Sequence, residues 1–146
     1  MRVVRYFRDL EAWQSAIDVA VEAHSFAGQL PPTHRFELGS QIRRSATSIP
    51  SNIAEGHSQR GDRVFLRHVR IALGSLAELD TQVEIAIRSK LIDEGAARSL
   101  RIDLARTGKL LHGLRRTLRV STALTTGGVI LLVSALSGLT WVGLAA

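Results

Sequence analysis

Cysteine is absent from the 146 residues, and aromatic residues are few, with two Trp, one Tyr and four Phe. The absence of cysteine excludes disulfides, thiolate zinc sites and cysteine nucleophiles. The scarcity of aromatic rings argues against the stacking platforms that single-strand nucleic-acid binders use. The chain also begins without a charged and then apolar leader, so we expect the amino-terminal part to be cytoplasmic.

Signatures of metal and catalytic sites are missing as well. The five histidines fall in different segments, and no two of them are spaced as metal ligands on one helix (His24, His34, His57, His68 and His112). There is no phosphate-cradling glycine loop and no nucleophile elbow. The sequence therefore predicts a protein without a cofactor, a metal site or catalytic residues, and not an enzyme.

Basic residues, in contrast, are abundant and nearly all of one kind. Nineteen Lys and Arg outnumber thirteen Asp and Glu, which gives a net charge of +6, and 17 of the 19 are arginine. A guanidinium group binds a phosphate as a two-pronged fork, whereas an ammonium group acts as a point charge. This composition favours an anionic partner, and the alternative is that the arginines merely solvate helix surfaces.

Glycines and prolines divide the chain into four segments with helical periodicity. The first helix is predicted over residues 9–27, with Asp9 as its N-cap. The second is predicted from Thr33, as its N-cap, to about residue 55, with a bend at Pro50. The predicted core positions are Leu10, Trp13, Ile17, Val21 and His24 in the first helix and Leu38, Ile42, Ser45, Ile49, Ile53 and Gly56 in the second.

The third helix is predicted over residues 62–88 and the fourth over residues 93–120. Their apolar stripes recur at steps of three and four, with Phe65, Val69, Ala72, Leu76, Leu79, Val83 and Ile87 in the third and Leu100, Leu104, Leu111, Leu114 and Leu118 in the fourth. Helices joined by short loops return alongside one another. The predicted fold is therefore all-α, an up-down-up-down antiparallel four-helix bundle over residues 1–120.

Residues 121–146 form an apolar C-terminal tail of a different character, since none of them is charged. The stretch 128–146 is almost wholly apolar or small, and about 20 residues of helix match a hydrocarbon core of about 30 Å. It is a candidate transmembrane segment, and Arg115, Arg116 and Arg119 before it would keep the bundle on the cytoplasmic side of an inner membrane. The alternative is a packed or disordered extension.

Polar side chains follow the edges of two apolar stripes. Gln41, Ser48, Asn52 and Glu55 form a strip on the second helix, and Ser75, Glu78 and Gln82 form another on the third. One interpretation is an active site, because paired carboxylates can serve as acid and base. The favoured interpretation is a structural polar network, in which buried polar groups bond one another between helices and fix their register.

Basic side chains line up on the fourth helix, on the side away from its leucines. Six basic residues lie within about 80° of arc, at 100° per residue, and this ridge contains no acid between Arg98 and Arg119; they are Arg98, Arg101, Lys109, His112, Arg116 and Arg119. The third helix adds Arg63, Arg67 and Arg70 opposite its core. We predict that these rows bind nucleic-acid backbone, RNA or DNA, without reading base sequence. The alternatives are a membrane-tethered scaffold whose basic face contacts anionic lipid, and a solvated face.

Two motifs carry a family resemblance. The run from Gln41 to Gly56, with the sequence QIRRSATSIPSNIAEG, and the run from Ile71 to Leu79, with the sequence IALGSLAEL, resemble the four-helix-bundle proteins of 23S ribosomal RNA intervening sequences, as do Leu10 and Trp13. The resemblance covers about four fifths of the chain, and the tail after Val120 departs from the family pattern.

The resemblance has implications for partners. The same family includes the accessory protein of diversity-generating retroelements, which this chain resembles in fold. That protein forms a pentamer that binds nucleic acid and a reverse transcriptase. The resemblance thus implies a homo-oligomer, a pentamer by analogy, with nucleic acid and a reverse transcriptase as expected partners.

Overall fold

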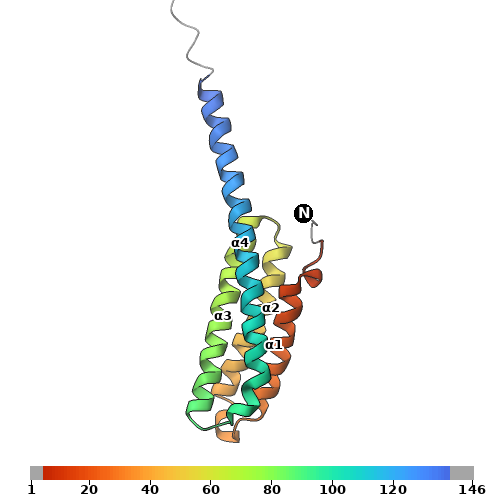
Figure 1. Ribbon diagram of the computed structural model, residues 1–146, viewed down its shortest axis with the longest axis vertical. Coiled ribbons are helices and arrows are strands. Elements are labelled where there is room, and N and C mark those ends of the chain that lie inside the picture. The colour runs from red at the N-terminus through yellow and green to blue at the C-terminus, as the bar shows by residue number, and fades with distance from the viewer. Residues whose placement is uncertain (1–4, 139–146) are drawn as a thin grey trace, which may run out of the picture.

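Four helices make up most of the computed structural model, which describes the backbone of residues 5–138 and the side chains of residues 5–124. They are α1 (Glu11–Gly28), α2 (Leu38–Ser58), α3 (Asp62–Arg88) and α4 (Glu94–Gly138), with short 3-10 turns η1 (Phe7–Asp9) and η2 (Pro32–His34). Each helix runs antiparallel to the next, and α4 returns to contact α1, which closes the bundle (Figure 1). The predicted all-α antiparallel four-helix bundle is confirmed.

The core of α1 is built from alanine, and the predicted face of this helix is wrong. Val21 is 66% exposed and His24 is also exposed, whereas Trp13 and Ile17 are half-buried. The buried positions are Ala12, Ser15, Ala16, Val19, Ala20, Ala23, Phe26 and Ala27. Small alanine side chains allow α1 to approach α2 and α4 closely, so the buried stripe is centred on them rather than on Trp13, Ile17 and Val21.

Both predicted N-caps are also wrong. Asp9 lies within η1, and α1 is preceded by Leu10 without a side-chain capping bond. Thr33 lies within η2, and α2 begins only at Leu38. Side chains hold this longer connection in place, since Arg35 Nε donates to the carbonyl of Leu30 at 2.9 Å and Arg43 donates to the carbonyl of Arg35 at 2.8 Å.

The core face of α2 and the limits of α3 agree with the sequence prediction. Ile42, Ser45, Ile49, Ile53 and Gly56 are all buried. The α2 helix passes through Pro50 as one element, and α3 spans Asp62–Arg88 as predicted. Between α2 and α3, Gly61 has a φ of 114°, a backbone conformation that side chains other than glycine rarely adopt.

The last helix differs from the prediction at its carboxyl end. It does not end at Val120 but continues as one helix to Gly138 and leaves the bundle (Figure 1). The predicted tail 121–146 is therefore helical over its first 18 residues. The candidate membrane segment 128–146 falls on residues whose side chains, or whose whole placement from 139 onward, lie outside the described part of the structure. Among the described residues, no helix combines the length and apolarity needed to span a bilayer.

Candidate nucleic-acid interface

Three contacts set the register of α3 against α4. Glu84 pairs with Arg101, Leu76 packs beside Gly108, and Asp62 accepts a hydrogen bond from Ser121. The first turns of α3 therefore lie level with the part of α4 around residues 114–121. This register places two rows of arginine at the same level of the bundle, Arg63, Arg67 and Arg70 on α3 and Arg115, Arg116 and Arg119 on α4.

A hollow at this level of α4 is lined by basic side chains. Its volume is about 540 Å³, and its lining consists of His112, Arg115, Arg116, Arg119, Val120 and Ala123. No acidic residue takes part in this lining. The three arginines of α3 are exposed, and Arg115 on α4 is half-buried. The other basic residues of α4 at this level are exposed as well, namely Lys109, His112, Arg116 and Arg119. We refer to Arg63, Arg67, Arg70, Lys109, His112, Arg115, Arg116 and Arg119 as the basic patch.

Two residues of the predicted basic ridge lie outside this patch. Arg98 is exposed in the first turns of α4, at the opposite end of the bundle. Arg101 forms an ion pair with Glu84, which also binds Arg88 at 2.6 Å. Hydrogen bonds from Arg88 and then Arg101 lower the pKa of the Glu84 carboxyl. Arg101 thus shares an acid on another helix with Arg88, which a projection of α4 alone cannot reveal.

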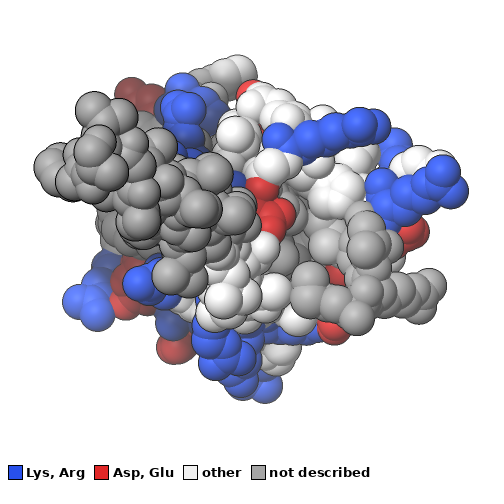
Figure 2. All heavy atoms as spheres, turned by 90° about the horizontal axis from the view of Figure 1, so that it is seen from above, with Lys and Arg blue, Asp and Glu red and all other residues white. Residues whose placement is uncertain are grey.

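Arg115 was missed by the sequence projection because it lies beyond the chosen arc. Its membership depends on the fold, since it shares one hollow with Arg116 and Arg119. Viewed from the end at which α4 leaves the bundle, arginine and lysine side chains project at several places around the edge of the molecule (Figure 2). Any test of the patch therefore needs a control of equal charge elsewhere.

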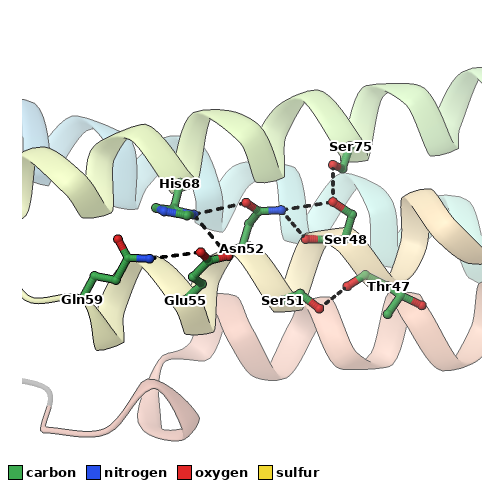
Figure 3. A network of polar contacts seen from close by, with 8 residues as sticks. All are labelled: Thr47, Ser48, Ser51, Asn52, Glu55, Gln59, His68 and Ser75. Carbon is green, nitrogen blue, oxygen red and sulfur yellow. Dashed lines mark hydrogen bonds and ion pairs between the residues drawn. The ribbon is translucent and has the colours of Figure 1, made fainter.

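The polar strips of α2 and α3 meet in a hydrogen-bonded network (Figure 3). Ser75 donates to Ser48 Oγ at 2.9 Å, and Asn52 Nδ2 donates to the same oxygen at 3.1 Å and to the Ser48 carbonyl at 2.9 Å. Asn52 Oδ1 lies 3.2 Å from His68 Nδ1, and a Glu55 carboxylate oxygen lies 3.9 Å from the same nitrogen. His68 was missed as a member, although it precedes Ser75 by seven residues on the same face.

A second polar layer lies further along the same two helices. Ser45 Oγ donates to Gln82 Oε1 at 2.7 Å, and Gln82 Nε2 donates to Glu78 Oε1 at 3.1 Å. Gln41 is exposed, and its backbone carbonyl accepts from Ser45 Oγ at 3.1 Å. Glu55 lies near His68, whereas Glu78 bonds Gln82 in the next layer along α3, so the two carboxylates belong to different layers of the bundle. In the described part of the chain, no group of His, Asp and Glu could hold a metal ion.

A third polar contact joins α1 to α4 and was not foreseen. The hydroxyls of Ser15 and Thr107 lie 2.7 Å apart, and both residues are buried. Thr107 lies between Leu104 and Leu111 at steps of three and four, so its place on the apolar stripe was a signal available in the sequence. Buried polar contacts therefore occur between α1 and α4 as well as between α2 and α3.

Comparison with known proteins identifies the family of this chain. The family model described as 23S rRNA-intervening sequence protein matches residues 8–113. The chain belongs to this family. A solved structure of a protein of unknown function from the S23 ribosomal protein family of Bacteroides thetaiotaomicron is 27% identical, with a TM-score of 0.66. The match covers 71% of this chain and 97% of that one. A search of curated proteins found no match.

The family match agrees with the polar network. It includes both sequence motifs, and the hydrogen-bonded residues of α2 and α3 lie within these motifs or a few residues from them. The match ends at residue 113, so Arg115, Arg116 and Arg119 of the basic patch lie beyond it. The other five residues of the patch lie within the matched range.

Proposed function

We propose that this family member is a non-enzymatic accessory protein that binds the phosphate backbone of nucleic acid through the basic patch. The observation that carries the proposal is the hollow lined by His112, Arg115, Arg116 and Arg119 without any acidic residue. Arginine suits this role because its guanidinium group matches the geometry of phosphate oxygens. Phosphate contacts fix the position of a protein but carry no direct sequence information, so binding should be independent of sequence.

The family description names intervening sequences of 23S rRNA, so RNA is the first nucleic acid to test. By resemblance to the retroelement accessory protein, the proposal extends to a homo-oligomer, a pentamer by analogy, with a reverse transcriptase as a protein partner. An oligomer would repeat the basic patch in each copy. Several patches on one nucleic-acid molecule would raise the apparent affinity without any new type of contact.

The test compares two variants of equal net charge in binding to a mixed-sequence RNA duplex. Arg116→Glu with Arg119→Glu reverses two charges in the basic patch, whereas Arg44→Glu with Arg98→Glu reverses two exposed charges outside it. The patch variant should lose most of its affinity, and the control variant should keep most of its own. Because all four side chains are exposed, both variants should remain folded.

Two results would count against the proposal. Equal losses in both variants would mean that only the overall charge matters and that the patch is not a site. Binding of the parent to vesicles rich in anionic lipid, without binding to RNA, would favour a membrane surface as the partner.

A further inference from the structure

A second hollow lies between α3 and α4 and has an apolar floor. Its volume is about 670 Å³. The floor is formed by Leu73, Leu76 and Ala77 from α3 and by Leu104, Ala105 and Gly108 from α4. We call this hollow the α3–α4 groove. It adjoins the basic patch, because Lys109 and His112 lie on its edge.

Small residues keep the groove open. A Cβ atom at Gly108 would lie 3.3 Å from Leu76 Cδ2, so the glycine permits the close approach of α4 to α3. Ala77 and Ala105 are exposed, and Leu73 and Leu76 are half-buried. Larger side chains at the two alanines would fill the groove, so the sequence leaves apolar surface uncovered here.

The rim of the groove is mainly basic. Arg101, Lys109 and His112 line it from α4, and Asp80 lines it from α3. Arg101 uses its terminal nitrogen to bind Glu84, but its Nε atom is buried and has no hydrogen-bond partner in the described part of the chain. Because this nitrogen has no exposed surface and Arg101 is paired with Glu84, the positive charge that the rim offers to a partner is mainly that of Lys109, beside His112.

We propose that the α3–α4 groove binds an acidic amphipathic helix of a partner protein. The apolar floor would contact leucine-like residues at helical spacing, and the acidic residues would face Lys109 and His112. The groove spans residues 101–112 of α4, which at 1.5 Å per residue corresponds to about 16 Å, or three turns of helix.

An open groove suits a helix better than a lipid chain. A helix can bury one apolar stripe and keep its charged face in water, whereas an acyl chain in the same groove would remain partly exposed. The floor of the groove can be altered without changing any charge. Peptide binding can therefore be tested separately from nucleic-acid binding.

The experiment uses a labelled peptide of about 14 residues, with leucine at positions i, i+3, i+4 and i+7 and glutamate on the opposite face. Two control peptides have the same composition in scrambled order and the same pattern with lysine in place of glutamate. The full chain is compared with Ala77→Gln/Ala105→Gln, which fills the groove with polar side chains, and with Ser99→Gln on the exposed surface of α4 outside the groove.

The patterned acidic peptide should bind the parent and Ser99→Gln, and both control peptides should bind at least about tenfold more weakly. The groove variant should lose peptide binding while its affinity for RNA and its melting temperature stay unchanged. Failure of the parent to bind at about 100 μM peptide would overturn the proposal, as would equal binding of the scrambled peptide or unchanged binding by the groove variant.

Discussion

Replacing Gly56 with alanine should destabilise the bundle, although alanine is the better helix former. A Cβ atom at this position would lie 2.5 Å from His68 Cβ and 3.0 Å from Phe65 Cδ2. The clash is with an atom next to the backbone of α3, so a side-chain rotation cannot relieve it and the two helices have to move apart. Overpacking of this kind costs about 1–3 kcal/mol.

Separation of the helices would also weaken the network beside the clash. Asn52 Oδ1 and His68 Nδ1 are 3.2 Å apart, and the loss of such a hydrogen bond costs about 0.5–1.5 kcal/mol. Alanine recovers about 1 kcal/mol of helix propensity. The expected net loss for Gly56→Ala is therefore about 0.5–3.5 kcal/mol of unfolding free energy.

Gly74 provides a matched control within α3. A Cβ atom there would meet nothing within 4 Å, so Gly74→Ala should gain about 0.5–1 kcal/mol from helix propensity. Denaturant unfolding followed by far-UV circular dichroism measures both changes. If Gly56→Ala stabilised the protein as much as Gly74→Ala, the close approach of α2 to α3 at this point would be refuted.

Three further predictions concern polar contacts. Asn52→Ala should lower the unfolding free energy by about 1–3 kcal/mol. Glu55→Ala should change it much less, because the Glu55 side chain is 58% exposed. The denaturant midpoints of the two variants measure this difference. Ser15→Ala should lower the unfolding free energy by about 1–3 kcal/mol, because it leaves the Thr107 hydroxyl buried without a partner. Adding Thr107→Val removes that hydroxyl and should restore part of the loss. A double-mutant cycle measures the coupling between the two residues. Hydrogen bonds from Arg88 and Arg101 lower the pKa of Glu84, so the stability that Glu84 contributes is present above its unfolded-state pKa and is lost as the pH falls through its folded-state pKa. Glu84→Gln should therefore lack this acid-dependent loss of stability in melts at decreasing pH. A variant whose stability falls with pH as that of the parent does would contradict this prediction.

Helix existence and the faces of α2 and α3 could be predicted because their apolar residues are large and regularly spaced. Ile42, Ile49 and Ile53 mark the buried face of α2 without ambiguity, and all three are buried. The face of α1 could not be found in this way. Trp13 and Ile17 are only half-buried, and most of its buried positions are alanines, whose burial depends on how closely two neighbouring helices approach.

The candidate site was only partly accessible from the sequence, because charges on one helix are balanced by residues on another. Arg101 fits the basic arc of α4 by angle, but it is paired with Glu84 from α3, which also binds Arg88. Arg115 lies outside the arc, yet the hollow that it shares with Arg116 and Arg119 includes it. The sequence prediction also ended α4 too early, at Val120. Charged residues are absent from the sequence beyond this point, but the helix itself continues to Gly138.

The most direct test of the central proposal is the salt dependence of RNA binding. The logarithm of the affinity should fall linearly with the logarithm of the salt concentration, with a slope of about 0.9 for each phosphate contacted on a duplex. Reversing Arg116 and Arg119 removes two such contacts and should reduce the slope by about 1.8, while reversing Arg44 and Arg98 should leave the slope of the parent. A parent that does not bind at about 50 mM salt, or a patch variant whose slope equals that of the parent, would contradict the proposed function.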